Sequence, residues 1–259
     1  MEKNKTRASQ DGGTNNNYYE ICDQGFSGRF LSNYGLVGYW KFDEGAGTTT
    51  NDSSSYDNHG TLCNGATCPQ QGPIWQASDC ISNNCLSFDG VNDYVKILHS
   101  SSLNLTEQMT ISFWVNVNSL PVGGWAGILT KWEKWWYPAY SVNLNPQGGV
   151  YSESSGLSPA YSYGPNLSTG TWYHVVYFYD GSKIGMYVNT VPYNHKSVKG
   201  QPISNQGNVI IGWTNVAFKG AIDEVRIYNR ALSACEVCEL CRAYWTKAQC
   251  NNCTDCSGN

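Results

Sequence analysis

Apolar and polar residues alternate in short runs along most of the chain, and Gly, Asn and Asp separate the runs at spacings of about ten residues. In residues 110–118, one side of a strand carries Thr110, Ser112, Asn116 and Asn118, and we expect it to be mostly in contact with water. The other side, expected to face a core, carries Ile111, Phe113, Val115 and Val117. This pattern predicts an all-β sandwich of two packed antiparallel sheets over residues 36–230, with little helix before Ala231.

A second alternating run leads into a predicted hairpin. In residues 172–178 the side of the strand that we expect to face the core carries Trp172, His174, Val176 and Phe178. Asp180-Gly181 supplies a turn that tolerates positive φ. The chain then returns through a strand whose apolar residues are Ile184, Met186 and Val188.

Near the C-terminus the pattern predicts a last strand and then a short helix. The strand runs from Ala221 to Tyr228. Ser233 is the expected N-cap of the helix, because Glu236 follows it in capping-box position.

Composition divides the chain into three parts. Residues 1–35 are rich in Asn, Gly, Ser and charge and contain few apolar side chains, which predicts a disordered tail or linker. Residues 36–232 carry the alternating runs and form the predicted sandwich. Residues 233–259 form a Cys-rich appendage, expected to be helical or hairpin-like.

Several segments, in order along the chain, resemble the laminin-G-like jelly-roll family of the concanavalin A-like lectin/glucanase superfamily, whose relatives include pentraxins and legume lectins. The segments are GLVGYWKFDEGAGTTTNDSS, CLSFDGVNDYVKI, MTISFWVNV, GTWYHVVYFYDGSKIGMYVNTV and FKGAIDEVRIYNRALSACEV. The resemblance extends from about Leu36 to Leu240. It implies a jelly roll of two antiparallel sheets, often with bound calcium, that serves extracellular binding or adhesion. Some relatives with this fold are hydrolases or lyases.

Charge and cysteine content limit the classes of partner and the cellular compartments that suit this chain. The net charge is −4 with 16 Lys and Arg, which cannot neutralise a run of phosphates, so nucleic acid is excluded as a partner. Eleven Cys indicate an oxidising compartment, and we expect a secreted or cell-surface protein. The sequence as given shows neither a signal peptide nor a membrane span.

The cysteines fall into two groups with different predicted chemistry. Two pairs with short spacings are expected to form local hairpin disulfides, Cys63 with Cys68 and Cys80 with Cys85. The tail holds two C-x-x-C-x-x-C triplets, which a hairpin would pair as Cys241 with Cys250, Cys238 with Cys253 and Cys235 with Cys256. A zinc or iron–sulfur site is the alternative for the tail, because C-x-x-C is also a metal-binding spacing.

An acidic residue in the last predicted strand is a candidate metal ligand. Period-two alternation places Asp223 on the same face as Val225 and Ile227, where an unpaired carboxylate is costly. Ca²⁺ would accept such a carboxylate.

The resemblance implies a structural calcium ion between an early acidic loop and the last strand. The matching residues are Asp43 or Glu44, together with Asp52 and Asp223. The alternative is that Asp52 caps a turn and that Asp223 pairs with Lys41 or Arg226.

The aromatic segment from Trp125 to Tyr140 is the candidate ligand site. Adjacent Trp135 and Trp136 cannot both face the core of one strand, so an exposed indole is expected. Sugar rings stack on aromatic faces and bond to nearby polar groups, which predicts a polysaccharide or glycoconjugate ligand. The predicted ligand-binding residues are Trp132, Glu133, Trp135, Trp136, Tyr137, Tyr140 and Asn143, and the same surface could include Tyr161, Tyr163 and Trp213.

Motifs for catalysis are weak. The E-x-D-x-x-E strand motif of laminarinase-like enzymes and the G-x-S-x-G elbow do not occur. Glu133, Glu153 and Asp180 are interpreted as isolated, solvated carboxylates, and His174 as a satisfied buried histidine. The resulting hypothesis is a non-catalytic, calcium-stabilised, extracellular carbohydrate-binding or adhesive module, with multivalent display as one mode of use. The alternatives are a polysaccharide-degrading enzyme of the same fold and a structural surface or filament protein.

Overall fold

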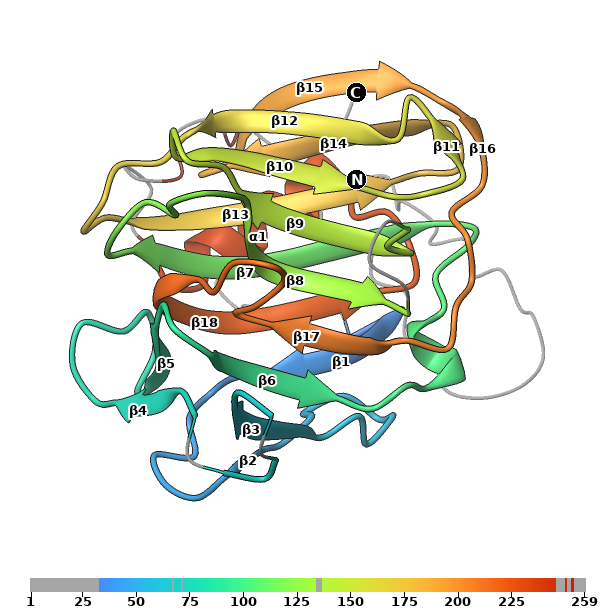
Figure 1. Ribbon diagram of the computed structural model, residues 1–259. Helices are drawn as coiled ribbons and strands as arrows, with labels where there is room; N and C mark the ends of the chain where they lie inside the picture. The colour runs from blue at the N-terminus through green and yellow to red at the C-terminus, as the bar shows by residue number, and fades with distance from the viewer. Residues whose placement is uncertain are drawn as a thin grey trace, which may run out of the picture.

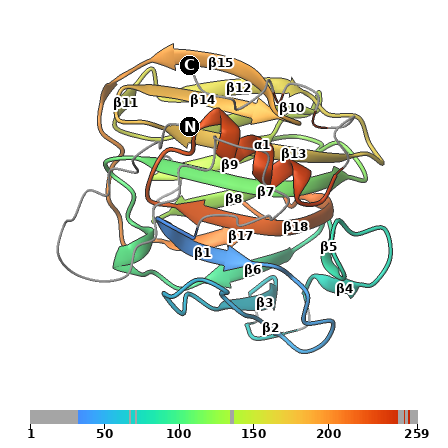
Figure 2. The same ribbon diagram turned by 180° about the vertical axis from the view of Figure 1, so that it is seen from behind.

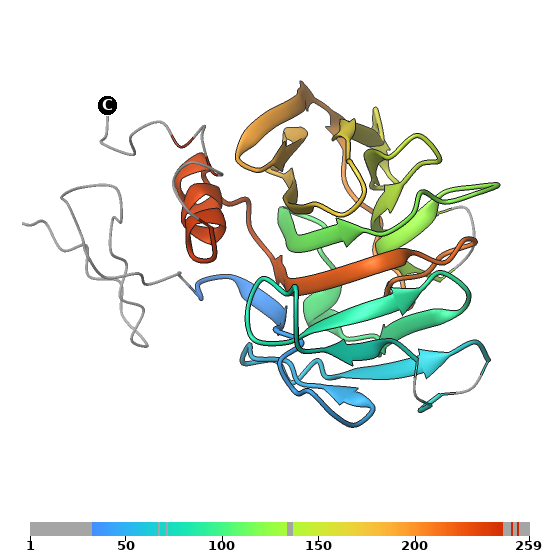
Figure 3. The ribbon, with the colours of Figure 1, turned by 90° about the vertical axis from the view of Figure 1, so that its left-hand side faces the viewer.

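The computed structural model describes residues 33–66, 68–70, 72–133, 137–245, 250 and 253. Two eight-stranded sheets, in which all strand pairs are antiparallel, are stacked as a sandwich (Figures 1 and 3). The predicted two-sheet all-β fold is therefore confirmed. Of the predicted disordered tail, only residues 33–35 are among the described residues.

We name the two sheets A and B. Sheet A runs in the order β15 (Val191–Ser197), β14 (Lys183–Val188), β13 (Trp172–Tyr179), β7 (Met109–Val117), β18 (Lys219–Tyr228), β5 (Cys85–Asp89) and β4 (Ile74–Gln76), and β1 (Leu36–Trp40) also pairs with β18. Sheet B runs in the order β12 (Tyr161–Asn166), β10 (Gly149–Glu153), β9 (Tyr140–Leu144), β8 (Ala126–Trp132), β17 (Asn208–Ile211), β6 (Asp93–Ile97), β3 (Gly60–Asn64) and β2 (Thr49–Thr50). The short strands β11 (Leu157–Ser158) and β16 (Lys199–Gly200) form a separate pair, and a 3₁₀ turn, η1, spans Ser101–Leu103.

One continuous core lies between the sheets. The inward sides of β7 and β18 meet the inward sides of β8, β9 and β17 there. Burial of apolar area contributes about 25 cal/mol per Å², so large buried side chains dominate the stability of such a core. Those with almost no exposed surface include Trp40, Phe42, Phe88, Phe113, Tyr140, Tyr177 and Phe218.

The predicted hairpin is confirmed as the β13–β14 pair. Asp180 Oδ1 accepts hydrogen bonds from the backbone N–H groups of Ser182 and Lys183 at 2.8 and 2.7 Å, and Gly181 has φ +94°. The predicted inward face of β13 is wrong, however. Val175, Tyr177 and Tyr179 point into the core, and the outer face carries Trp172, His174, Val176 and Phe178.

Helix α1 (Ala234–Arg242) lies on the outer face of sheet A (Figures 2 and 3). Its predicted capping box is confirmed, because Ser233 Oγ accepts from the Glu236 N–H and the Glu236 side chain accepts from the Ser233 N–H. Val237 and Leu240 pack against Val176 and Tyr228 of the sheet. No helix in the described part of the chain has the length and apolar character needed to cross a membrane.

The outer face of β7 is mostly buried, contrary to the sequence prediction, and only Asn116 on it is half-buried. Thr110 and Ser112 have no exposed surface, and Trp114 is covered by Trp245 and the tail cysteines. The C-terminal segment seals the centre of this face. Strand β7 is therefore buried on both sides, which period-two alternation alone cannot distinguish from a half-buried strand.

Four of the predicted disulfides are confirmed. Cys63 pairs with Cys68, Cys80 with Cys85, Cys238 with Cys253 and Cys241 with Cys250. Cys235 is also disulfide-bonded, and its predicted partner Cys256 lies outside the described residues. The metal-site alternative is excluded for the four tail cysteines whose pairing is described.

Candidate functional site

The outer face of sheet B contains a hollow of about 530 Å³, a size typical of ligand sites. Strands β8, β9 and β10 form its base. The loop before β8, with Gly124 and Trp125, forms one wall, and the loop after β17, with Thr214 and Val216, forms another. The two loops are joined by a hydrogen bond of 3.1 Å from Thr214 Oγ1 to the Trp125 carbonyl oxygen.

Strand alternation and register decide which side chains reach the hollow. On β10, Val150 and Ser152 are buried inward, so Tyr151 and Glu153 point outward. Antiparallel pairing places Tyr151 opposite Asn143 of β9, and Glu153 opposite Ser141. The next pair along this second row is Ser141 with Thr130 of β8. The result is two parallel rows of outward side chains that cross the sheet.

Aromatic rings continue from the hollow to the edge of sheet B. The ring of Trp125 lies 4.4 Å from that of Tyr151, and Tyr151 lies 5.6 Å from Tyr161 and 5.2 Å from Tyr163 of β12, centroid to centroid. Trp125, Tyr161 and Tyr163 are 41%, 41% and 45% exposed. We call Trp125, Tyr151, Tyr161 and Tyr163 the aromatic strip. An exposed strip of contiguous rings is the kind of surface that marks a binding site.

Polar groups inside the hollow are only partly satisfied by the protein. Asn143 Nδ2 donates to Ser141 Oγ at 2.9 Å, which leaves the Asn143 carbonyl oxygen available as an acceptor. The Thr130 hydroxyl is buried without a hydrogen-bond partner among the described residues. Glu153 is half-buried, and this burial raises the pKa of its carboxyl above the ordinary value.

The structure separates the predicted ligand-binding residues into several groups. Trp132 and Asn143 both line the hollow. Tyr137 and Glu133 are exposed beside it, and Glu133 Oε2 accepts from the Gln206 N–H at 3.1 Å. Trp135 and Trp136 lie outside the described residues.

Tyr140 is a correction to the predicted set. It is fully buried, and its hydroxyl donates to the Leu103 carbonyl oxygen at 3.1 Å, so it belongs to the core. Tyr151 was not predicted, and Glu153 was interpreted as solvated. The sequence around Tyr151 and Glu153 contains no motif that marks a binding site. The pairing of β10 with β9 and β12 brings the two side chains to the hollow.

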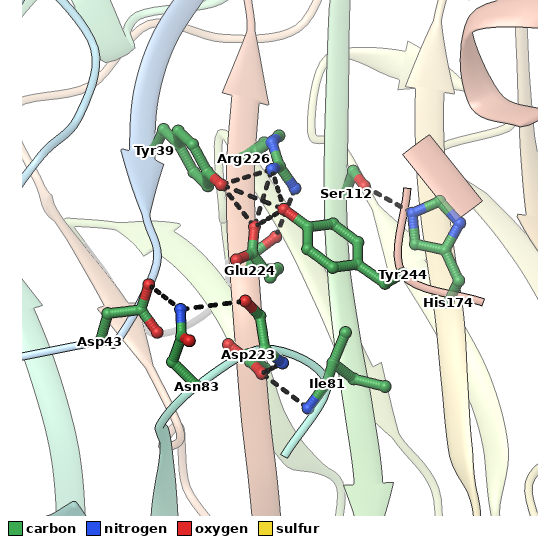
Figure 4. Close-up of polar contacts among 11 residues, drawn as sticks. Tyr39, Asp43, Ile81, Asn83, Ser112, His174, Asp223, Glu224, Arg226 and Tyr244 are labelled. Carbon is green, nitrogen blue, oxygen red and sulfur yellow. Dashed lines mark hydrogen bonds and ion pairs between the residues drawn. The ribbon is translucent and has the colours of Figure 1, made fainter. Parts of the chain in front are cut away.

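A buried polar network lies on the opposite face, beneath the C-terminal segment (Figure 4). Glu224 Oε2 accepts from the Tyr39 hydroxyl at 2.5 Å and from the Tyr244 hydroxyl at 2.6 Å. It also pairs with the Arg226 guanidinium at 2.7 Å. The guanidinium lies 3.9 Å from the centre of the Tyr39 ring. Because every member is buried or half-buried against the others, we assign this network to docking of the tail rather than to a ligand.

Ser112 and His174 form a second buried contact near this network (Figure 4). The Ser112 hydroxyl lies 2.8 Å from His174 Nε2, while Nδ1 has no partner among the described residues. Burial, with a smaller contribution from Arg226, lowers the pKa of His174 to about 3. The prediction that this histidine is buried is confirmed, but only one of its ring nitrogens is hydrogen-bonded. Trp114, the cross-strand neighbour of His174, stacks on it at 4.9 Å, and Ser112 and His174 are both buried.

A β-bulge changes the predicted face of Asp223. The register of β18 against β7 shifts between Asp223 and Arg226, and Glu224, the inserted residue, has φ +54°. Asp223 consequently points to the outer face, opposite the face that carries Val225 and Ile227. The alternative interpretation, in which Asp223 pairs with Lys41 or Arg226, is also wrong: Arg226 binds Glu224, and no ion pair in the described part of the chain joins Asp223 to Lys41.

Asp223 instead holds the loop that the Cys80–Cys85 disulfide closes. Its Oδ2 accepts from the backbone N–H groups of Ile81 at 2.9 Å and Ser82 at 3.1 Å. Its Oδ1 is buried without a partner among the described residues. Burial raises the pKa of this carboxyl to about 8.

The other predicted calcium ligands lie in different surroundings. Asp43 contacts the same loop as Asp223, and its Oδ2 accepts from Asn83 Nδ2 at 3.2 Å (Figure 4). Glu44 Oε1 accepts from the Asn51 N–H at 2.6 Å and is thus engaged locally.

Asp52 caps a turn, as the alternative interpretation expected. Its two oxygens accept from the N–H groups of Tyr39, Ser54 and Asn58 and from the Ser54 hydroxyl. Within the described ranges, no group of three or more His, Cys, Asp and Glu side chains is placed to hold a metal ion.

Comparison with solved structures shows the same fold at low sequence identity. Domain 4 of an extracellular arabinanase from Geobacillus stearothermophilus, solved in complex with arabinotriose, is 21% identical, with a TM-score of 0.60 over 78% of this chain and 96% of that one. The binding domain of paraclostridial mosquitocidal protein 1 is 18% identical, with a TM-score of 0.63 over 81% and 52%. Trypanosoma rangeli sialidase is 17% identical, with a TM-score of 0.59 over 80% and 32%. The chain thus spans about half of the second structure and about a third of the third.

Sequence comparison identifies the family. Among curated protein sequences, none matches the chain significantly. The family model of the concanavalin A-like lectin/glucanases superfamily matches residues 89–238, which include strands β6 to β18 and the start of helix α1. The chain therefore belongs to the concanavalin A-like lectin/glucanases superfamily.

Proposed function

We propose that the chain is a non-catalytic, extracellular carbohydrate-binding module whose site is the hollow and the aromatic strip on sheet B. The observation that carries the proposal is the combination of contiguous exposed rings with unsatisfied polar groups beside them. A sugar ring has apolar C–H faces and a polar rim of hydroxyl groups. It needs both kinds of surface in one place, and the outer face of sheet B offers them.

Each part of the site has a role in this proposal. Trp125 and Tyr151, whose rings meet edge to face, offer stacking surfaces at the wall and base of the hollow. The carbonyl oxygen of Asn143 and the carboxylate of Glu153 accept hydrogen bonds from sugar hydroxyls. Tyr161 and Tyr163 extend the stacking surface toward the sheet edge, so a chain of several sugar units can lie along the strip.

The lining supports binding more than hydrolysis. Glycoside hydrolysis commonly uses two carboxylates that flank the scissile bond. Among the described residues that line the hollow, Glu153 is the only carboxylate. The enzyme alternative would require a second acid from elsewhere.

Two further observations support an extracellular sugar ligand. The disulfides require an oxidising compartment to persist. The similar arabinanase domain was solved in complex with arabinotriose. Stacking on a few rings gives weak affinity, on the order of micromolar to millimolar, so useful retention would rely on multivalent display.

Calcium is the structural part of the proposal. Asp43 and Asp223 contact the same loop, and the unpartnered Oδ1 of Asp223 suits a hard cation, since Ca²⁺ takes carboxylate and carbonyl oxygens. Asp52 is not part of this pair, because hydrogen-bond donors occupy both of its oxygens. A bound ion would fix the position of the loop and would stabilise the ionised form of the Asp223 carboxyl.

A glycan array tests the proposal. We expect the wild type to be retained on polysaccharides and Tyr151→Ala and Trp125→Ala to lose retention. Tyr56→Ala is the matched control, because Tyr56 is 47% exposed and does not line the hollow. Release of reducing sugars by the wild type would instead place the chain among the enzymes.

A further inference from the structure

We propose that Glu153 restricts the hollow to uncharged glycans and excludes chains that carry a carboxylate, such as uronates and sialic acids. This inference rests on the proposed function and names the class of sugar that the same site takes. It narrows the expectation from a glycan in general to a neutral one.

The charge of the lining is the first observation. The described residues around the hollow are glycines, aromatic residues, hydroxyl and amide side chains, proline and valine, and Glu153 is their single charged member. No hydrogen bond or ion pair within the described part of the chain engages its carboxylate. Within the described lining, a ligand in the hollow therefore meets one negative charge that no cation pairs with.

The position of Glu153 makes that charge effective. It stands opposite Ser141 on one side and Tyr161 on the other, in the row of outward side chains that crosses the sheet. It also lies next to Tyr151, whose pKa is raised by burial and further by the charge of Glu153. Because the carboxylate is half-buried, with Ser141 opposite it on one side and Tyr161 on the other, water screens it less than it would screen a surface charge. A second carboxylate in the hollow would be repelled, whereas hydroxyl groups would donate to Glu153.

The basic residue Lys196 contacts the aromatic strip but does not line the hollow. Lys196 Nζ lies 5.4 Å from the ring centre of Tyr161 and 5.8 Å from that of Tyr163, at the end of the strip formed by β12. Lys196 does not line the hollow and makes no ion pair with Glu153. Lys196 thus does not pair with the charge of Glu153, and neither does any other basic residue in the described part of the chain.

The experiment compares neutral and acidic trisaccharides on one array at pH 7.5. The neutral probes are arabinotriose and the trisaccharides of glucose, galactose and mannose; the acidic probes are the corresponding hexuronate trisaccharides and a sialyl trisaccharide. The proteins are the wild type, Glu153→Gln, the control Glu107→Gln and Tyr151→Ala. Glu107→Gln removes an exposed carboxylate that does not line the hollow.

We expect the wild type to retain neutral probes at least about tenfold better than acidic ones, as repulsion between two poorly screened charges allows. Glu153→Gln should reduce that ratio to near unity, and Glu107→Gln should leave it unchanged. Equal retention of acidic and neutral probes by the wild type, or an unchanged ratio in Glu153→Gln, would overturn the inference. If those results occur while Tyr151→Ala still abolishes retention, the proposed function stands. Failure of the wild type to retain any probe, or no effect of Tyr151→Ala, would remove the proposed function and the inference with it.

Discussion

The hydroxyl of Tyr244 lies 2.6 Å from Oε2 of Glu224, so the segment that follows helix α1 is hydrogen-bonded to the inserted residue of strand β18. The same oxygen pairs with Arg226, whose side chain is only 4% exposed. Tail and sheet thus share one buried carboxylate. Its removal should loosen both.

Glu224→Gln should lower the free energy of unfolding by about 3 kcal/mol, because it leaves the buried Arg226 guanidinium without an anionic partner. Tyr244→Phe should cost about 1 kcal/mol, the value of one hydrogen bond. Urea unfolding measures both. Glu107→Gln, at an exposed glutamate, is the control, and a loss in Glu224→Gln no larger than in this control would contradict the assignment of the network to tail docking.

Acid should destabilise the protein through His174. The pKa of its imidazole is 6.5 as an ordinary value and about 3 in the folded protein, so the folded state disfavours the charged form. The stabilisation is present above pH 6.5 and is lost as pH falls towards 3, at up to about 1.4 kcal/mol per pH unit. His174→Gln should lack this part of the slope in unfolding curves collected from pH 7 to pH 4. Parallel slopes for wild type and variant would show that His174 does not titrate in this way.

Calcium should stabilise the wild type, because a ligand that binds only the folded state raises the melting temperature. Asp223→Ala should melt at the same temperature with calcium and with chelator. Asp52→Ala is the informative control, since it removes a turn cap and should lower the melting temperature without abolishing the response to calcium. A wild-type melting curve that chelator leaves unmoved would argue against the ion.

The tail cysteines should resist alkylation in the unreduced protein, which intact mass spectrometry can measure. Replacing Cys238 and Cys253 together by Ser should lower the free energy of unfolding by about 3 kcal/mol, because the bond closes a loop with a sequence separation of 15. Reactive thiols at these positions, with stoichiometric zinc or iron, would contradict the pairing.

Local patterns predicted the parts of the fold that depend on neighbours in sequence. The Asp180-Gly181 hairpin, the Ser233–Glu236 capping box and the close cysteine pairs belong to this class. The faces of β7 and β13 were harder to predict, because helix α1 and the tail cover the side that a free sheet would expose. Both sides of these strands carry residues suited to burial, so alternation could not identify the core side.

The candidate site, too, could be predicted only in part from local sequence patterns. The density of aromatic residues in one segment predicted Trp132 and Asn143 as ligand-binding residues, and both line the hollow. It also predicted Tyr140, which belongs to the core. Tyr151 and Glu153 reach the hollow through long-range strand pairing, which no short motif encodes.

The bulge in β18 should affect how related chains differ in length at this strand. Three residue steps from Asp223 to Arg226 oppose two steps from Trp114 to Ser112, so Glu224 is a one-residue insertion relative to a regular strand. Deleting it would keep Asp223 and Arg226 on the outer face and Val225 in the core. What the deletion would remove is the carboxylate that Tyr244 and Arg226 share. We therefore expect this single codon to be gained or lost together with the Cys-rich tail among related chains.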